Sequence, residues 1–303
     1  MSAPAIVTEG LTKRFGRVQA VDALDLRVRP GEVVGFVGPN GAGKTTTIRM
    51  LLGFLRPTAG RCRVLGGDLA SAVKLRGRVG YLPGDLRVDP GMTGAQLFAW
   101  YGRLRGGLDQ DRVARLTERL GLDPTRRFGT LSKGNRQKVG LVQAFAHDPD
   151  VLVLDEPTTG LDPLVQREFL RLVREAAQRG AAVLFSSHVL PEVQRVADRL
   201  AVIRSGRLVS VAGVDELLDR ARHRLELRYN HPVPAGFLAG LSGVRVDERD
   251  GRTAVITVDG PVGPALRAAA DTPGLLRVSP GGDELEDLFL SLYRPDSGHA
   301  EVS

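Results

Sequence analysis

The chain of 303 residues is 42% hydrophobic and 25% charged, which fits a folded protein with one large and one smaller domain and excludes disorder, collagen and a coiled coil as the main architecture. Its most apolar runs, at residues 33–37 and 151–154, are far shorter than the roughly 20 residues that cross a bilayer. The lone cysteine, Cys62, excludes an internal disulfide framework and a multi-cysteine zinc site.

The net charge of +7 is unevenly distributed. Residues 1–220 carry 33 basic and 23 acidic side chains, a balance of +10, whereas residues 221–303 carry 9 and 12, a balance of −3. The excess is either a set of solvated arginines or a surface that handles phosphates or faces an anionic partner, and charge alone does not separate the two. The first ten residues lack the basic start and apolar stretch of a secretory signal, so we expect a cytosolic protein.

The first large domain is predicted over residues 4–220, where strand signals alternate with helix signals. Apolar runs bounded by glycine or proline indicate buried strands, and the segments between them have helical periodicity. Buried strands that alternate with helices predict a mostly parallel sheet. The main elements of this pattern are expected at residues 33–37, 45–55, 151–154, 163–178 and 181–185.

Helices predominate in the middle of this domain. Three of them are predicted at residues 93–105, 109–120 and 133–146, and together they indicate a helical subdomain of about residues 85–147 inserted into the α/β body. A hairpin over residues 201–209, with its turn at Ser205-Gly206, closes the body.

The pattern changes after residue 220. Residues 221–295 predict a small α+β domain whose element order, βαββαβ, suggests a ferredoxin-like fold, and residues 296–303 are expected to form a flexible tail. The order rests on strands predicted at residues 225–229, 244–249, 253–258 and 275–278, and on helices predicted at 234–241, 261–270 and 284–293.

A glycine-rich loop follows the strand at residues 33–37 and has the spacing of a P-loop. Glycines let successive backbone N–H groups turn toward a phosphate, and the start of the next helix adds a positive dipole. Lys44 would reach the β- and γ-phosphates of ATP, and the Thr45 hydroxyl would bind Mg²⁺. The predicted nucleotide-binding residues here are Gly38, Pro39, Asn40, Gly41, Ala42, Gly43, Lys44, Thr45 and Thr46.

Two acidic residues end the apolar strand at residues 151–154. A buried strand that delivers carboxylates downstream of a P-loop is the usual second part of a Mg-nucleotide site. Asp155 would support the metal ion through its water shell. Glu156 would hold the attacking water as a general base, which requires a position within about 3 Å of the proton that it takes.

With residues 131–135 (LSKGN) between them, these two motifs resemble the ATP-binding cassette (ABC) family over about residues 4–220. The family signature is usually LSGGQ, and this chain keeps the serine and the second glycine. Downstream, residues 159–162 match the family's D-loop and His188 matches its switch histidine. The resemblance implies the P-loop NTPase fold of an ABC ATPase with an inserted helical subdomain.

The resemblance also implies a head-to-tail dimer of two copies. Ser132 and Gly134, at the start of a predicted helix, would bind the ATP held by the partner's P-loop. Phe15 takes the place of the family's adenine-stacking aromatic residue, and stacking requires no hydroxyl. The implied catalytic residues are Lys44, Glu156 and His188.

One loop departs from the family pattern. After the strand-like residues 79–83, family members place a glutamine or glutamate whose side-chain oxygen approaches Mg²⁺, whereas this chain has Gly84. Either that metal ligand is missing, or Asp85 supplies it from a loop that Gly84 makes flexible. A plain turn explains Asp85 equally well.

The resemblance is to exporter-type cassettes with a small accessory domain. It implies an ATPase that powers export of a drug-, antibiotic- or lipid-like substrate through a separate integral membrane permease, at the inner face of the cell membrane. The alternatives are a soluble ABC ATPase that acts on the ribosome or nucleic acid, and a plain nucleic-acid binder. A single P-loop, without coiled-coil insertion or basic-aromatic interleaving, disfavours both, so we expect no nucleic-acid partner.

Overall fold

The computed structural model describes residues 3–220, 223–234, 236–238 and 240–281. The described residues divide between Ala212 and Gly213 into two compact units, and each has a hydrophobic core of its own. Among the described residues, we find no helix of the length and apolarity that a membrane span requires.

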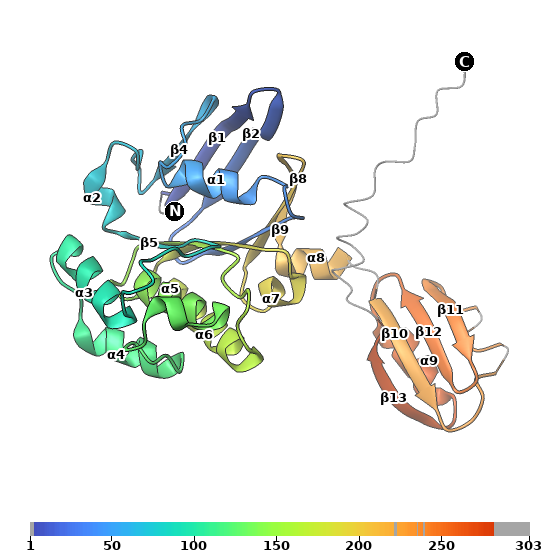
Figure 1. The fold of residues 1–303 in the computed structure, drawn as a ribbon. Helices are drawn as coiled ribbons and strands as arrows, with labels where there is room; N and C mark the ends of the chain where they lie inside the picture. Colours follow the sequence, from blue (N-terminus) through green and yellow to red (C-terminus); the bar gives the residue numbers. More distant parts are fainter. Residues whose placement is uncertain (1–2, 221–222, 235, 239, 282–303) are drawn as a thin grey trace, which may run out of the picture. The chain divides into compact units, whose positions relative to one another are not determined.

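A six-stranded sheet forms the centre of the first unit (Figure 1), in the order β5-β6-β7-β3-β8-β9. The neighbours from β5 to β8 run parallel, and β9 follows β8 through the turn at Ser205-Gly206, where both residues have positive φ. The predicted parallel sheet and its closing hairpin are therefore confirmed. The strands are β3 (Val33–Val37), β5 (Val79–Leu82), β6 (Val151–Asp155), β7 (Ala182–Ser187), β8 (Arg199–Arg204) and β9 (Arg207–Gly213).

The helices of this body are α1 (Lys44–Leu51), α6 (Pro163–Gln178) and α7 (Leu190–Gln194). Helix α1 ends four residues earlier than predicted because Gly53 adopts a left-handed conformation with φ 73°. The Asp162 carboxylate caps α6 by accepting hydrogen bonds from the N–H groups of Leu164 and Val165.

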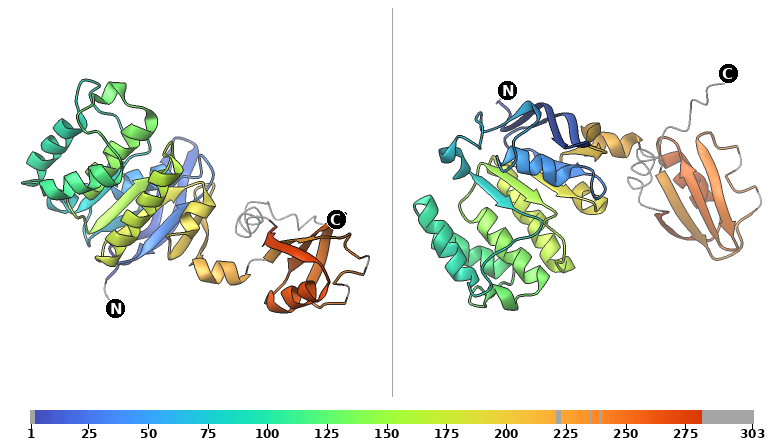
Figure 2. Two further views of the ribbon diagram at one scale, coloured as in Figure 1. Left: turned by 90° about the horizontal axis from the view of Figure 1, so that it is seen from below. Right: turned by 45° about the horizontal axis from the view of Figure 1, so that its top comes forward.

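The three predicted helices of the middle segment are also confirmed, and Figure 2 shows them gathered beside the six-stranded sheet. They are preceded by a short helix, α2 (Val73–Arg76), and a 3-10 turn at Phe128–Thr130 separates the second of them from the third. Each of the three begins at a side-chain cap, as its sequence requires. They are α3 (Gly94–Arg105), α4 (Gln110–Arg119) and α5 (Lys133–Phe145), capped by Thr93, Asp109 and Ser132.

A second, three-stranded antiparallel sheet was not predicted. It has the order β2-β1-β4 and consists of β1 (Ile6–Phe15), β2 (Val18–Val28) and β4 (Ala59–Val64). Helix α1 contacts this sheet and strand β6 of the central sheet, and the three elements share one core. Register shifts within β1 interrupt the period-two alternation that marks a strand.

The second unit contains α8 (Val214–Arg220) and a four-stranded sheet in the order β11-β12-β10-β13. All neighbouring strands are antiparallel. Strand β12 lies between β10 and β11, as in a split βαβ arrangement. This order agrees with the predicted ferredoxin-like arrangement. The elements are β10 (His223–Tyr229), β11 (Val244–Asp250), β12 (Thr253–Val258), α9 (Gly263–Asp271) and β13 (Leu275–Pro280).

The helix predicted over residues 234–241 is wrong for the described residues there, which form turns. Leu238 has φ 54°, a left-handed conformation that a helix does not accept. The predicted helix at residues 284–293 and the predicted tail at 296–303 lie outside the described residues.

Candidate active site

The chemistry-bearing motifs of the first unit meet at one edge of the parallel sheet. Strand register pairs Asp155 with Ser186 and Val37 with Ser187, so the glycine-rich loop after β3, the acidic pair at the end of β6 and the segment after β7 are neighbours. The carboxyl ends of parallel strands are the usual position of a ligand site in such folds. The predicted motifs are therefore brought together by the sheet itself.

The glycine-rich loop is packed too tightly for side chains at two of its glycines. A β-carbon on Gly38 would lie 2.4 Å from the carbonyl oxygen of Ile203, and one on Gly43 would lie 2.5 Å from that of Ala20. Gly43 also has φ 109°. The loop surrounds a cavity of about 190 Å³ lined by residues 39–46, Ala20 and Glu156.

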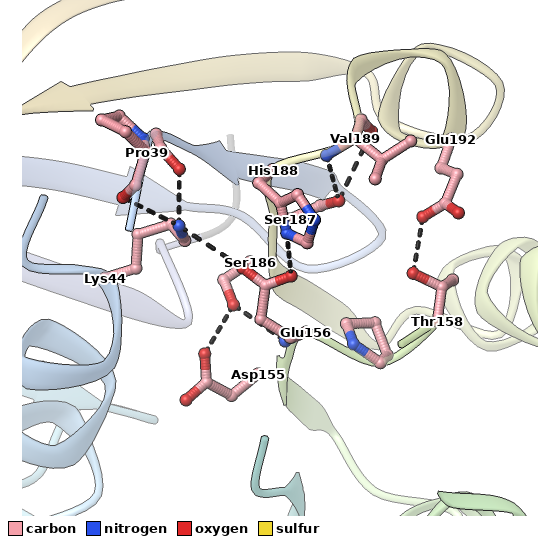
Figure 3. Close-up of polar contacts among 12 residues, drawn as sticks. Pro39, Lys44, Asp155, Glu156, Thr158, Ser186, Ser187, His188, Val189 and Glu192 are labelled. Carbon is pink, nitrogen blue, oxygen red and sulfur yellow. Dashed lines mark hydrogen bonds and ion pairs between the residues drawn. The ribbon is translucent and has the colours of Figure 1, made fainter. Parts of the chain in front are cut away.

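The Lys44 side chain is held against the backbone of this loop (Figure 3). Its Nζ donates hydrogen bonds to the carbonyl oxygens of Gly38, at 2.5 Å, and Pro39, at 3.2 Å. It also lies 3.4 Å from Glu156 Oε1, and only 6% of the side chain is exposed. A buried ammonium held by carbonyls and a carboxylate is a site where a phosphate oxygen would be strongly attracted.

Asp155 is 3% exposed and accepts two hydroxyl hydrogen bonds. Thr45 Oγ1 donates to its Oδ2 at 2.9 Å, and Ser186 Oγ donates to its Oδ1 at 2.6 Å. The donor set consists only of hard oxygens, which fits Mg²⁺, an ion that binds one or two carboxylates and keeps water and phosphate oxygens for its other positions.

Glu156 occupies an unusual backbone conformation, with φ 48°. Its N–H donates to Ser186 Oγ at 3.0 Å, and its Oε2 lies 2.7 Å from Nδ1 of His188. Its side chain is 21% exposed, unlike the buried Asp155. The Glu156 carboxylate therefore lines the loop cavity with access to solvent, and a histidine orients it. A general base requires this arrangement.

Ser132 and Gly134 lie at the start of α5 but do not line the cavity of the glycine-rich loop. Ser132 Oγ accepts a hydrogen bond from the Asn135 N–H, at 3.3 Å, so it caps the helix. A β-carbon on Gly134 would lie 2.5 Å from the carbonyl oxygen of Gly160. The start of α5 thus rests directly on the predicted D-loop.

Phe15 lies at the end of β1 and is 48% exposed. Its strand partner is Val18, two residues before Ala20, which lines the loop cavity. Lys13 Nζ lies 5.1 Å from the ring centroid. The ring is thus exposed, and adenine stacking stays a prediction.

Gly84, not Asp85, faces the acidic strand end. A β-carbon on Gly84 would lie 3.6 Å from Asp155 Oδ2. The Asp85 side chain is 73% exposed and pairs with Arg87, with 2.9 Å between Oδ2 and Nε. The metal role of Asp85 therefore stays a prediction, and it requires this carboxylate to leave Arg87.

A larger groove of about 890 Å³ opens beside this loop, between α1, β5 and α3. Phe54 is an exposed aromatic on its wall and packs edge-on against Tyr81. Burial and the nearby Asp155 carboxylate raise the pKa of Tyr81 to about 12. Arg49 and Arg105 also line the groove, and Arg105 Nε has no hydrogen-bond partner within the described structure.

Sequence reasoning missed several residues of the site. Ser186 binds both Asp155 and the Glu156 backbone, and its position two residues before the predicted switch histidine was the signal that could have found it. Thr158 Oγ1 donates to Glu192 Oε2 at 2.5 Å, which connects the segment after Glu156 to α7. No sequence pattern pairs these two, because 34 residues separate them.

A family model described as ABC transporter matches residues 21–159. The daunorubicin/doxorubicin resistance ATP-binding protein DrrA of Streptomyces peucetius is 36% identical over 95% of this chain and 92% of its own length. The bacitracin transport ATP-binding protein BcrA of Bacillus licheniformis is 31% identical over 95% and 96%. The Nod factor export ATP-binding protein I of Burkholderia orbicola is 35% identical over 96% and 98%.

Solved structures of ABC cassettes are similar to this chain in fold. An ATP binding subunit of an ABC transporter superimposes with a TM-score of 0.66 and 27% identity, over 70% of this chain and 91% of that structure. A bacterial ABC transporter cassette solved as a dimer has a TM-score of 0.63 and 20% identity, over 69% of this chain and 98% of its own, and supports the fold alone.

Proposed function

The chain belongs to the ATP-binding subunits of ABC transporters, and we propose that it hydrolyses ATP to power export of a drug-, antibiotic- or lipid-like substrate through a separate membrane permease. The observation that carries the proposal is that the similarity to proteins named for drug resistance, bacitracin transport and Nod factor export covers at least 95% of this chain in each case. The similarity therefore includes the second unit as well as the ATPase body.

In the proposed reaction, the glycine-rich loop binds the phosphates of ATP. The γ-phosphate takes the place of the Gly38 and Pro39 carbonyls at the Lys44 ammonium, where its charge is compensated. The start of α1 adds backbone N–H groups and a positive dipole end. Glu156 accepts a proton from the attacking water, and His188 holds the carboxylate in place through the 2.7 Å contact.

Thr45 and Asp155 are the residues that would hold Mg²⁺, as their oxygens lie together beside the loop. When bound, the ion would neutralise charge on the β- and γ-phosphates. The Ser186 hydroxyl donates a hydrogen bond to Asp155 Oδ1 and helps to hold this carboxylate in place.

A head-to-tail dimer of two copies completes the proposed site. Ser132 and Gly134 form a helix start that does not line the cavity of the glycine-rich loop in the same chain, although helix starts bind anions well. In the dimer, this start would bind the γ-phosphate held by the partner's loop. ATP would then join the two copies and hydrolysis would separate them, which converts chemistry into movement.

The groove beside Gly84 is the proposed docking site for a cytoplasmic helix of the permease. It combines an exposed aromatic, Phe54, with the cationic Arg49 and Arg105, so it suits a helix with apolar and acidic side chains. Its wall includes Thr45 and Asp155, and an occupant would therefore touch the nucleotide site. This docking would place the chain on the inner face of the cell membrane.

The test isolates the tagged Glu156→Gln variant from detergent-solubilised membranes with Mg-ATP present. A photo-crosslinking amino acid at Phe54 should join the chain to an integral membrane protein identified by mass spectrometry. The same group at Leu276, an exposed residue of the second unit, serves as the control. Recovery of ribosomal proteins or nucleic acid without any membrane protein would instead support the soluble cassette.

A further inference from the structure

Gln137 is a buried polar residue that the proposed chemistry does not use. It lies on α5, five residues after Ser132, and is 4% exposed. Its Nε2 donates to the carbonyl oxygens of Glu156, at 3.2 Å, and Pro157, at 3.0 Å. Both N–H groups of this side-chain amide are therefore directed at the backbone of the catalytic segment.

The backbone of Glu156 needs such support because its conformation is unfavourable. A non-glycine residue with φ near 48° has a strained backbone, which persists only when its surroundings hold it. Ser186 Oγ on β7 accepts from its N–H, and Gln137 donates to its carbonyl oxygen. The two peptide groups that set the direction of the Glu156 side chain are thus fixed by two different elements.

Helix α5 makes two further close contacts, one with the segment that follows Glu156 and one with β5. Its start packs on Gly160, where a β-carbon on Gly134 would lie 2.5 Å from a carbonyl oxygen. Farther along, a β-carbon on Gly140 would lie 2.3 Å from a methyl carbon of Leu82, so α5 also packs closely on β5. A displacement of α5 is therefore transmitted to the segment that begins at Glu156, because close-packed contacts do not absorb it.

We propose that Gln137 is a positioning residue that holds the backbone of Glu156 and couples the direction of its carboxylate to helix α5. This inference rests on the proposed catalytic role of Glu156 and on the proposed dimer. When the start of α5 engages the γ-phosphate of the partner's nucleotide, Gln137 moves with the helix and aligns the general base of its own chain. Each copy would then hydrolyse ATP efficiently only when the start of its own α5 binds the γ-phosphate of the partner's nucleotide.

The experiment compares two variants of Gln137. Gln137→Met keeps the length of the side chain and removes both N–H donors, whereas Gln137→Glu keeps its shape and places a carboxylate against the carbonyl oxygens of Glu156 and Pro157. We expect kcat at saturating Mg-ATP to fall about ten- to a hundredfold in both variants, since small misplacements of a catalytic group cost up to about 10²-fold. The affinity for ATP should change less than about threefold, because no contact of the loop is removed. Thr117→Val is the control, as it removes a buried hydroxyl bond to Ala114 within the same subdomain.

A double-variant test separates positioning from simple destabilisation. Because Gln137 acts through Glu156, Gln137→Met should cause no further loss of kcat in a Glu156→Gln background. Multiplied losses, or unchanged kcat in both Gln137 variants while Glu156→Gln is inactive, would overturn the role of Gln137 alone. Full turnover of Glu156→Gln would overturn the catalytic assignment of Glu156 and this inference with it.

Discussion

A single methyl group at Gly134 provides a sharp test of the contact between α5 and the predicted D-loop. Gly134 lies in the first turn of a helix, where alanine is intrinsically favoured by up to about 1 kcal/mol. The alanine β-carbon would nevertheless lie 2.5 Å from the Gly160 carbonyl oxygen. The local preference and the tertiary contact therefore predict opposite effects of Gly134→Ala.

The size of the effect follows from that distance. Most real contacts of a β-carbon exceed 3.4 Å, so the start of α5 and the D-loop must separate by about 0.9 Å, a displacement of the kind that costs up to about 10²-fold in catalysis. The separation would move Ser132 away from the partner's nucleotide. Crowding of a well-packed site also costs about 1–3 kcal/mol of folding free energy, which exceeds the gain in helix propensity.

The assay measures three quantities for Gly134→Ala and for Gly77→Ala. They are kcat at saturating Mg-ATP, the affinity for ATP at low protein concentration, and the midpoint of thermal unfolding. Gly77 is a matched control because its φ is −63° and a β-carbon there would meet its nearest atom at an ordinary 3.6 Å. We expect a loss of about 10²-fold in kcat for Gly134→Ala, with its own ATP affinity preserved.

Equal kcat for Gly134→Ala and Gly77→Ala would refute the reasoning. It would mean that the close approach of α5 to Gly160 is relaxed in the active dimer. A loss of ATP affinity in step with kcat would also refute it, since Gly134 does not line the cavity of the glycine-rich loop and a β-carbon on it would meet only Gly160.

Three further outcomes are expected. Glu156→Gln should lower kcat by about 10²–10⁴-fold and accumulate an ATP-bound dimer in size-exclusion chromatography, whereas near-normal turnover would remove Glu156 from the role of base. Ser132→Arg should abolish hydrolysis but leave nucleotide binding intact, whereas Lys44→Ala should weaken nucleotide binding directly. Intact turnover in Ser132→Arg would contradict a site shared between two copies. Asp85→Ala should lower Mg²⁺-dependent turnover several-fold, with partial recovery in Asp85→Ala/Gly84→Gln, and superimposable Mg²⁺ titrations would make Asp85 a turn residue only.

The elements that the sequence predicted well are those with strong local signals. Strands such as β3 and β6 are buried at every position and consist of apolar residues and glycine up to Asp155 at the end of β6. The helices of the middle segment begin at Thr93, Asp109 and Ser132, side chains that cap helices. The antiparallel sheet escaped prediction because bulges in β1 break its alternation. The helix expected over residues 234–241 failed because the left-handed Leu238 is incompatible with it.

The motifs by themselves indicated the residues that we propose carry the chemistry of this ABC transporter subunit, since a phosphate loop and a strand that ends in two carboxylates are local patterns. Tertiary structure alone decided how those residues are held. Glu156 keeps its strained backbone through Ser186 and Gln137, which lie 30 and 19 residues away in the sequence. Likewise, Gly84 rather than Asp85 faces Asp155. Such contacts depend on strand register and helix packing, which bring distant residues together and leave no periodic signal in the chain.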